Sequence, residues 1–361
     1  MDREKRLPKI ASEQKLQQLD QRPQASRSSV GLRELAADLG LSQTTISRVI
    51  NRSPAANRIP ESTQKRVFEA ATRLKYEANV LARGLRNKRS FTVGVMVPEI
   101  SEGYSTTVLS GIEDALLREG FFYFVVSHRH RAELLEEYPE LLLSRAVEGI
   151  IAIDTQIEKE LPVPVVAVSG HKQLQNVVNV QLDHKKAVRL ALEHLHSLGH
   201  RKIAFIKGQV FSSDTKLRWK AVCDVSSELG IAVDPQLTVQ LDGPSPGTEP
   251  GHMAMQALLQ RKKRFTAIFA FNDLSAIGAI SALRETGLRV PHDMSVVGFD
   301  DILSASTNNP GLTTVHQPLR EMGGIAASTL LGMIRGDNVS KRVVRVLPTF
   351  IVRNSTSQAN N

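Results

Sequence analysis

The stretch SQTTISRVIN, residues 42–51, decides how the beginning of the chain folds. Its β-branched residues would suit a strand. A wheel with a step of about 100° per residue, however, separates its side chains into a polar and an apolar half. The polar half holds Gln43, Thr44, Ser47, Arg48 and Asn51, and the apolar half holds Thr45, Ile46, Val49 and Ile50. This separation predicts a short amphipathic helix, which Ser42 can begin as its N-cap.

The ten residues before this stretch, GLRELAADLG (31–40), predict a second short helix. Its apolar residues recur at helical spacing, and Gly40 is typical of a helix C-terminus. Two short helices joined by a tight turn are typical of the helix-turn-helix, whose second helix lies in the DNA major groove. A third helix is expected after Pro60. Its apolar stripe consists of Val67, Ala70, Ala71 and Leu74.

The polar half of residues 42–51 supplies candidate DNA contacts. We expect hydrogen bonds to base edges from Gln43, Thr44 and Arg48. We expect contacts to the phosphate backbone from Ser42, Thr45, Ser47 and Asn51. The alternative is a pair of surface helices whose polar face meets only solvent.

The positive charge of the chain is concentrated at its beginning. Residues 1–90 hold 19 Lys and Arg against 9 Asp and Glu, whereas the whole chain has 46 against 37. Residues 91–361 therefore hold 27 against 28 and are nearly neutral. A basic module on a neutral body predicts a polyanionic partner for that module, such as double-stranded DNA. The alternative is a solubilising tail.

From residue 91 onward, short apolar runs alternate with amphipathic stretches. The runs are FTVGVMVP, FFYFVVSH, VEGIIAID, VPVVAVS, VVNVQLD, RKIAFIKG, LTVQLDG, AIFAFND and MSVVGFDD. Such alternation predicts the α/β class, with parallel strands covered by helices on both faces. The length of this part favours two doubly wound subdomains over one sheet.

The composition of the chain limits the classes of protein to which it can belong. The chain of 361 residues is 41% hydrophobic and 23% charged, as expected for a globular protein. No apolar run approaches the roughly 18 residues of a membrane span, and residues 1–24 lack the apolar segment of a secretory signal. The single cysteine, Cys223, excludes an internal disulfide and a multi-cysteine zinc site. We therefore expect a cytoplasmic protein without membrane contact.

Several motifs together resemble the lactose-repressor/galactose-repressor family of bacterial transcription regulators over about residues 29–354. They are LRELAADLGLSQTTISRVIN, IPESTQKRVFEAATRLKYEAN, LARGLR, LGHRKIAFIKG, TAIFAFNDLSAIGAISALRETGLRVPHDMSVVGFDD and LTTVHQP. The resemblance implies a headpiece and two subdomains like those of type I periplasmic-binding proteins. It also implies a homodimer on a pseudo-palindromic operator, a small-molecule effector that resembles a sugar or another polar metabolite, and repression as the outcome. In LARGLR it implies a hinge helix that wedges into the minor groove through Ala82, Leu85 and Arg86.

These considerations predict the following organisation. The chain begins with a disordered basic extension (1–28), followed by the helix-turn-helix headpiece (29–76) and the hinge (77–90). The first subdomain consists of residues 91–208 and 318–342, and the second consists of residues 209–317 and 343–354. The chain ends in a tail, residues 355–361. The segment RSPAANRIPES is a few residues longer than in well-known family members, which predicts a longer loop beside the DNA backbone.

Ligands of open α/β sheets bind at the carboxyl ends of the strands, which points to an effector cleft. Residues directly after predicted strands are His128, Asp154, Ser169, Asn272, Asp273, Asp300 and Asp301. The resemblance adds an arginine, a wall of the cleft and an aromatic loop residue, so the effector-binding prediction is Tyr104, Arg218, Phe269, Asn272 and Asp300. Further candidates are His128, Asp154, Ser169 and Asp214. Asp273 and Asp301 also fit the simpler role of capping a helix or turn.

The sequence disfavours two other classes of protein. An enzyme is disfavoured because the chain has no G-x-S-x-G, P-loop or Rossmann glycine motif, so no catalytic residue, metal or cofactor is expected. His194, His196 and His200 have helical spacing, but His200 lies in the family turn SLGHRKI, which disfavours a metal site there. A periplasmic solute-binding protein would share the two subdomains, and it is disfavoured by the basic headpiece.

Overall fold

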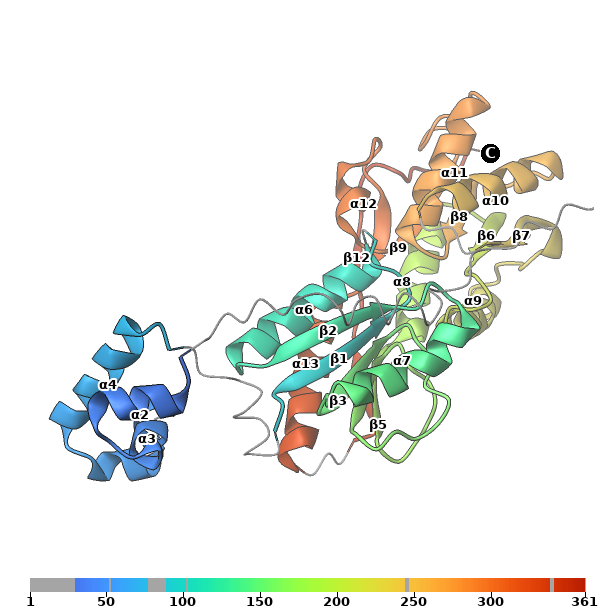
Figure 1. The fold of residues 1–361 in the computed structure, drawn as a ribbon. Helices are drawn as coiled ribbons and strands as arrows, with labels where there is room; N and C mark the ends of the chain where they lie inside the picture. Colours follow the sequence, from blue (N-terminus) through green and yellow to red (C-terminus); the bar gives the residue numbers. More distant parts are fainter. Residues whose placement is uncertain are drawn as a thin grey trace, which may run out of the picture. The chain divides into compact units, whose positions relative to one another are not determined.

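The computed structural model describes residues 30–51, 53–76, 89–101, 103–243, 247–337 and 341–360 (Figure 1). The chain divides into a unit of residues 1–88 and a unit of residues 89–361. The predicted extension 1–28 and the hinge residues Ala82, Leu85 and Arg86 lie outside the described residues. None of the described helices is long and apolar enough to cross a membrane.

The first unit consists of short helices around one small apolar core. They are α2 (Leu32–Leu39), α3 (Gln43–Ile50), the 3-10 helix η1 (Pro54–Arg58) and α4 (Glu61–Arg73). Leu35, Ile46 and Val67 come from the three α-helices and are fully buried in this core. Gly40 ends α2 in the left-handed conformation, and Ser42 caps α3 by accepting a hydrogen bond from the Thr45 backbone N–H at 3.1 Å. The two predicted helices and their turn are therefore present.

The helical wheel predicted the wrong environment for one residue of α3. Ser47 was expected on the outward face, but it is only 8% exposed. The Asn51 side chain lies against it, because its Nδ2 donates to Ser47 O at 2.7 Å and to Ser47 Oγ at 3.2 Å. Helix α3 also contacts η1, which follows it in the chain. A wheel treats a helix as isolated, so it cannot show covering by the next segment.

The first half of the second unit is a parallel six-stranded sheet in the order β11-β5-β4-β3-β1-β2. Its strands are β1 (Thr92–Val97), β2 (Phe122–Ser127), β3 (Gly149–Ile153), β4 (Val165–Val168), β5 (Val177–Leu182) and β11 (Val343–Val346). Helices α6 (Tyr104–Arg118) and α13 (Leu319–Arg335) pack against each other and share one apolar cluster with the sheet. Helix α7 (Ala132–Ser144) contributes to the cluster on the other face.

The second half has a sheet in the order β12-β10-β9-β8-β6-β7, parallel except for the β10–β12 pair. Its strands are β6 (Ile203–Lys207), β7 (Thr238–Gln240), β8 (Ala267–Ala270), β9 (Ser295–Asp300), β10 (Thr313–His316) and β12 (Thr349–Ile351). Its helices are α8 (His184–Ser197), α9 (Thr215–Glu228), α10 (Glu249–Gln260) and α11 (Asp273–Glu285), with the short η2 (Pro235–Leu237) and α12 (Leu303–Thr307). Helices α8 and α9 cover one face, and α10 and α11 cover the other. Two doubly wound sheets confirm the predicted fold class.

Two of the predicted subdomain boundaries, at residues 208 and 343, are wrong. Strand β6 already belongs to the second half because it pairs with β7 and β8, and α8 packs on α9, β10 and β12. Strand β11 still belongs to the first half because it pairs with β5. The chain therefore crosses between the halves before His184, between His316 and Leu319, and between Val346 and Thr349.

The predicted tail is also part of the fold. Ser355 is fully buried; its Oγ accepts from the Thr313 backbone N–H at 2.8 Å and donates to Val296 O at 2.6 Å. Further on, the Ala359 backbone N–H donates to Leu198 O at 2.8 Å. Residues 355–359 therefore line the second sheet, a role that their polar composition does not indicate.

Candidate DNA interface and ligand cleft

The residues predicted to read bases lie on one exposed face of α3. Gln43, Thr44 and Arg48 are exposed, whereas Ile46 and Val49 on the opposite side are buried. Gln43 and Thr44 lie in the first turn of α3, the part of a recognition helix that contacts base edges. The geometry of α2, α3 and their turn therefore presents a polar surface of the right kind.

The residues predicted to contact phosphates are more constrained. The Ser42 hydroxyl caps the helix and lies 2.9 Å from the Thr45 hydroxyl. Ser47 is buried against the Asn51 carboxamide. Ser42 and Asn51 are exposed at the two ends of the helix, so these two are the better placed for a backbone contact.

A cleft opens at the carboxyl ends of strands from both sheets of the second unit, as the strand-end rule predicts. Its cavity volume is about 150 Å³. The lining residues are Pro98, Glu99, Ser101, Tyr104, Ser105, His130, Asp154, Gln209, Phe211, Ser212, Asp214, Arg218, Leu241, Gly247, Pro250, Phe271, Asn272, Leu274, Ser275 and Asp300.

Six of the nine predicted effector residues line this cleft: Tyr104, Asp154, Asp214, Arg218, Asn272 and Asp300. Phe269 does not; it is 3% exposed in the core of the second half, and Phe271, just beyond the end of β8, forms the wall instead. His128 is buried, with its Nε2 2.9 Å from the Thr155 hydroxyl. Ser169 lies one contact behind the lining, 2.7 Å from the Tyr104 hydroxyl.

Several contacts hold the side chain of Arg218 in place in the cleft. Its guanidinium lies between two aromatic rings, 4.3 Å from the Phe271 centroid and 3.7 Å from the Phe299 centroid. It donates to Phe271 O at 2.6 Å and to Asp214 Oδ2 at 3.2 Å. Its Nε is buried and has no hydrogen-bond partner among the described residues. Stacking and hydrogen bonding orient the planar cation, as a site for a polar ligand requires.

Three carboxyl groups surround this arginine with different electrostatics. Burial raises the pKa of Asp300 to about 7 and the pKa of Asp154 to about 6. Burial acts in the same direction on Asp214, but the charge of His184 and the hydrogen bonds from both His171 and His184 hold the pKa of Asp214 well below its usual range. Three buried carboxyl groups with pKa values shifted in opposite directions thus lie in one cleft, and such a cluster is typical of a functional site.

The two halves are joined across the cleft by the segment before α9. The Asp154 Oδ1, at the end of β3, accepts from the Ser213 backbone N–H at 3.0 Å and from the Ser213 hydroxyl at 2.5 Å. The same hydroxyl lies 2.6 Å from Ser169 O, after β4. Residues 212–214 thus connect the strand ends of the first half to the second half.

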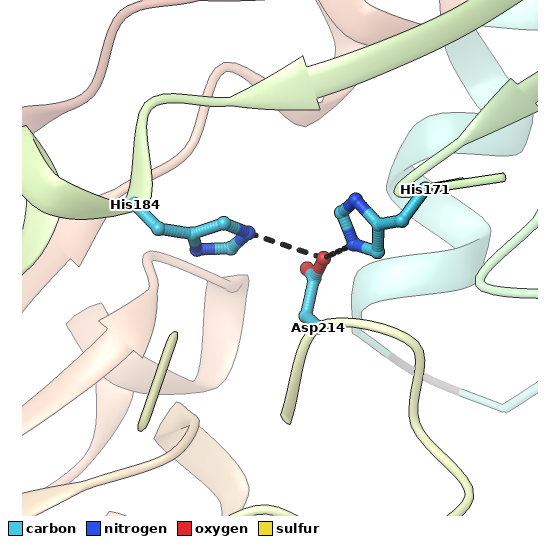
Figure 2. Close-up of side chains that lie close together, drawn as sticks. All are labelled: His171, His184 and Asp214. Carbon is cyan, nitrogen blue, oxygen red and sulfur yellow. Dashed lines mark hydrogen bonds and ion pairs between the residues drawn. The ribbon is translucent and has the colours of Figure 1, made fainter. Parts of the chain in front are cut away.

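Asp214 also accepts from two histidines, as Figure 2 shows. His171 Nε2 and His184 Nε2 lie 2.9 Å and 3.1 Å from the same carboxylate oxygen, Oδ1. His171 follows β4 of the first half, and His184 begins α8 directly after the chain crosses to the second. The pattern of strands and helices could not reveal this cluster, because the three residues are far apart in the sequence and lie at ends of elements.

Comparisons with known proteins agree with this architecture. Residues 192–356 match the model of the periplasmic binding protein-like domain. The transcriptional regulator DegA of Bacillus subtilis is 33% identical, over 91% of this chain and 98% of that protein. The transcriptional repressor PurR of Erwinia tasmaniensis is 30% identical, over 90% and 96%. The solved lac repressor dimer bound to operator and the anti-inducer ONPF has a TM-score of 0.82 at 26% identity, covering 91% of this chain and 99% of that one.

A helix-turn-helix unit joined to two sheets with a cleft between them defines a transcription regulator with a ligand-binding domain. The chain belongs to the lactose-repressor/galactose-repressor family of transcriptional regulators, and this confirms the resemblance seen in its motifs. The relatives named here are regulators of transcription rather than enzymes.

Proposed function

We propose that the chain is a cytoplasmic, dimeric repressor that binds a pseudo-palindromic operator, and that a small polar effector in the cleft controls its affinity for DNA. The observation that carries the DNA-binding part is the exposed face of α3 with Gln43, Thr44 and Arg48. Helices α2 and α4 hold this face outward by burying Ile46 and Val49 on its other side. A dimer would place two such helices in successive major grooves.

The hinge stays part of this proposal. Ala82, Leu85 and Arg86 match the family position that enters the minor groove. An apolar wedge at Leu85 would kink the operator, and the energy of unstacking would be offset by the additional contacts of the bent DNA. Movement of the two halves of the second unit could then reach the DNA through the residues that precede β1.

Arg48→Ala tests the recognition helix. We expect operator binding to weaken about 5- to 150-fold, which corresponds to roughly 1–3 kcal/mol for a lost base contact. The operator would first be selected from random duplexes with the full-length protein, and affinity measured by fluorescence anisotropy at two salt concentrations. Lys65→Ala is the matched control, because Lys65 is an exposed cation of α4 that pairs only with Glu69 among the described residues. Equal losses in the two variants would show that charge, not α3, carries recognition.

The effector part rests on the chemistry of the cleft. Arg218, Asn272 and the carboxyls of Asp154 and Asp300 offer directional hydrogen bonds to a small molecule with several hydroxyl or amine groups. A sugar-like effector is in keeping with the solved CelR–cellobiose complex, which is 28% identical with a TM-score of 0.67. The family's frequent aspartate after the fourth strand is Ser169 here, so the sugar itself is left open.

A thermal-shift screen of sugars and nucleobases would identify the effector, followed by DNA binding with and without each hit. Asn272→Ala is expected to abolish the shift, because Asn272 lines the cleft. A compound that stabilises the protein but leaves its operator affinity unchanged would argue against effector control while leaving the DNA-binding proposal intact.

A further inference from the structure

The cluster of His171, His184 and Asp214 has the composition of a metal site. Two imidazole nitrogens and one carboxylate oxygen all lie within 4.8 Å of one another. Both histidines present Nε2 to the same oxygen, at 2.9 Å and 3.1 Å (Figure 2). Two imidazoles and a carboxylate are ligands that Zn²⁺ commonly uses, with a fourth position left for water or a bound molecule.

The spacing of these atoms is close to what such a cation needs. Zinc bonds of 2.0–2.2 Å at tetrahedral angles place neighbouring ligand atoms about 3.3 Å apart. The Nε2 atoms of His171 and His184 are 0.2–0.4 Å short of this separation from Asp214 Oδ1. The two Nε2 atoms lie within 4.8 Å of each other, so both imidazoles and the carboxylate would adjust their positions to bind the ion.

The surrounding charge favours a cation. The carboxylate of Asp214 pairs with Arg218, and the carboxyl groups of Asp154 and Asp300 line the same cleft. Arg218 uses Oδ2 of Asp214, so Oδ1 remains available. Among the described residues, the donors to Oδ1 are the two histidines. A divalent ion at Oδ1 would be attracted by the carboxylate of Asp214, and by those of Asp154 and Asp300 when they are ionised.

We propose that His171, His184 and Asp214 bind a divalent transition-metal ion, with zinc as the expected species. The ion would tie together the loop after β4, the first residue of α8 and the start of α9. These segments belong to the first half, the crossing point and the second half, so metal binding would favour the arrangement in which the halves are joined. It would also place a Lewis-acidic position beside the effector cleft, which Asp214 lines.

The expected affinity is moderate. The Nδ1 atoms of both histidines are buried and have no hydrogen-bond partner among the described residues. Metal-bound imidazoles usually donate from the second nitrogen, and losing such support costs 10- to 100-fold in affinity. We therefore expect a dissociation constant near the micromolar range. Because imidazole binds metal only when neutral, affinity should fall as the pH is lowered. The His171 side chain is 20% exposed, which gives the ion a route of entry.

The test uses the full-length protein with any affinity tag removed and Cys223→Ser as background, so that the single thiol cannot bind metal. Titration with Co²⁺ should produce the visible absorption of a four-coordinate site at one ion per chain, and Zn²⁺ should displace it. Calorimetry with Zn²⁺ should give the same stoichiometry. Zn²⁺ should also raise the unfolding temperature.

Two variants and one control locate the site. His171→Gln and His184→Gln should each weaken Zn²⁺ binding at least tenfold and remove the Co²⁺ spectrum. His252→Gln should leave both unchanged, because His252 pairs with Glu285 at 2.8 Å on the surface of the second half, away from this cluster. His171 is partly exposed, so its variant is expected to fold even if His184→Gln does not. Absence of Co²⁺ absorption in the background protein, or equal binding in His171→Gln, would overturn the proposal.

Discussion

Asp300→Asn should make the ligand-free protein more stable at neutral pH. Asp300 is 7% exposed at the end of β9, and burial raises the pKa of its carboxyl to about 7 from an ordinary value of 3.8. The folded chain therefore holds this proton over a range in which the unfolded chain releases it. The resulting penalty is absent below about pH 4, grows with rising pH, and is complete above about pH 7.

The size of this penalty follows from the two pKa values. At about 1.36 kcal/mol per pH unit, the difference between 3.8 and about 7 corresponds to an upper limit of about 4 kcal/mol. An asparagine at this position keeps an oxygen that can accept from Gln317 Nε2, now at 2.6 Å from Asp300 Oδ1. It also removes one of the charges that raise the pKa of buried Asp273, which acts in the same direction.

The assay is urea unfolding at half-unit intervals from pH 5 to pH 8. The midpoint of the wild type should fall over this range, and that of Asp300→Asn should fall less steeply, because Asp154, whose pKa burial raises to about 6, still contributes to the decline. Asp293→Asn is the control, because the hydrogen bond from Arg289 holds the pKa of this partly exposed carboxyl at about 2, far outside the window. A decline of equal slope in wild type and Asp300→Asn would refute the buried-charge argument. The same variant should lose its response to the effector.

Three further predictions concern the fold. Gly111→Ala should lower the unfolding temperature by several degrees, because the new Cβ would lie 1.9 Å from Arg320 O in the α6–α13 contact; differential scanning calorimetry measures this, and an unchanged midpoint would exclude such close packing. Ser42→Ala should cost the first unit about 1 kcal/mol through the lost cap on α3, seen in unfolding of the isolated residues 1–88. Ser355→Ala should cost the second unit about 1–3 kcal/mol, since it leaves the buried Thr313 backbone N–H unpaired; no loss would mean that water replaces the hydroxyl.

The local sequence pattern was enough to recognise most strands and helices, but it could not predict which strands pair with each other. The apolar runs of β1 and β9 could be recognised because both strands are buried on both faces. The segments that form β11 and β12 are both short and lie close together in the chain, yet one pairs with β5 and the other with β10. Nothing in their composition decides this choice, which depends on where α13 returns the chain.

The site residues that lie at the ends of strands could be predicted from the sequence. Asp154 and Asp300 were found because they directly follow β3 and complete β9. Phe269 was assigned to the wall from the family resemblance, whereas in the structure it lies within β8 and Phe271, just beyond that strand, forms the wall. Ser213 and His171 come from connecting loops, and loops have no period from which a direction can be inferred.

The strand-end residues of the cleft combine backbone strain with buried charge, and this combination would allow the cleft to respond to the proposed effector. Asp154, Ser169 and Asp300 have positive φ values of 41°, 59° and 113°, in the region that favours glycine. Such strain costs of order 1–3 kcal/mol per residue, and burial of two of these carboxyls adds to it. A ligand that donates hydrogen bonds to Asp154 and Asp300 would recover part of this energy only while residues 212–214 keep the halves joined. Because a ligand shifts an equilibrium only by its difference in affinity for the two states, this local instability would supply energy for the control of the headpiece proposed above.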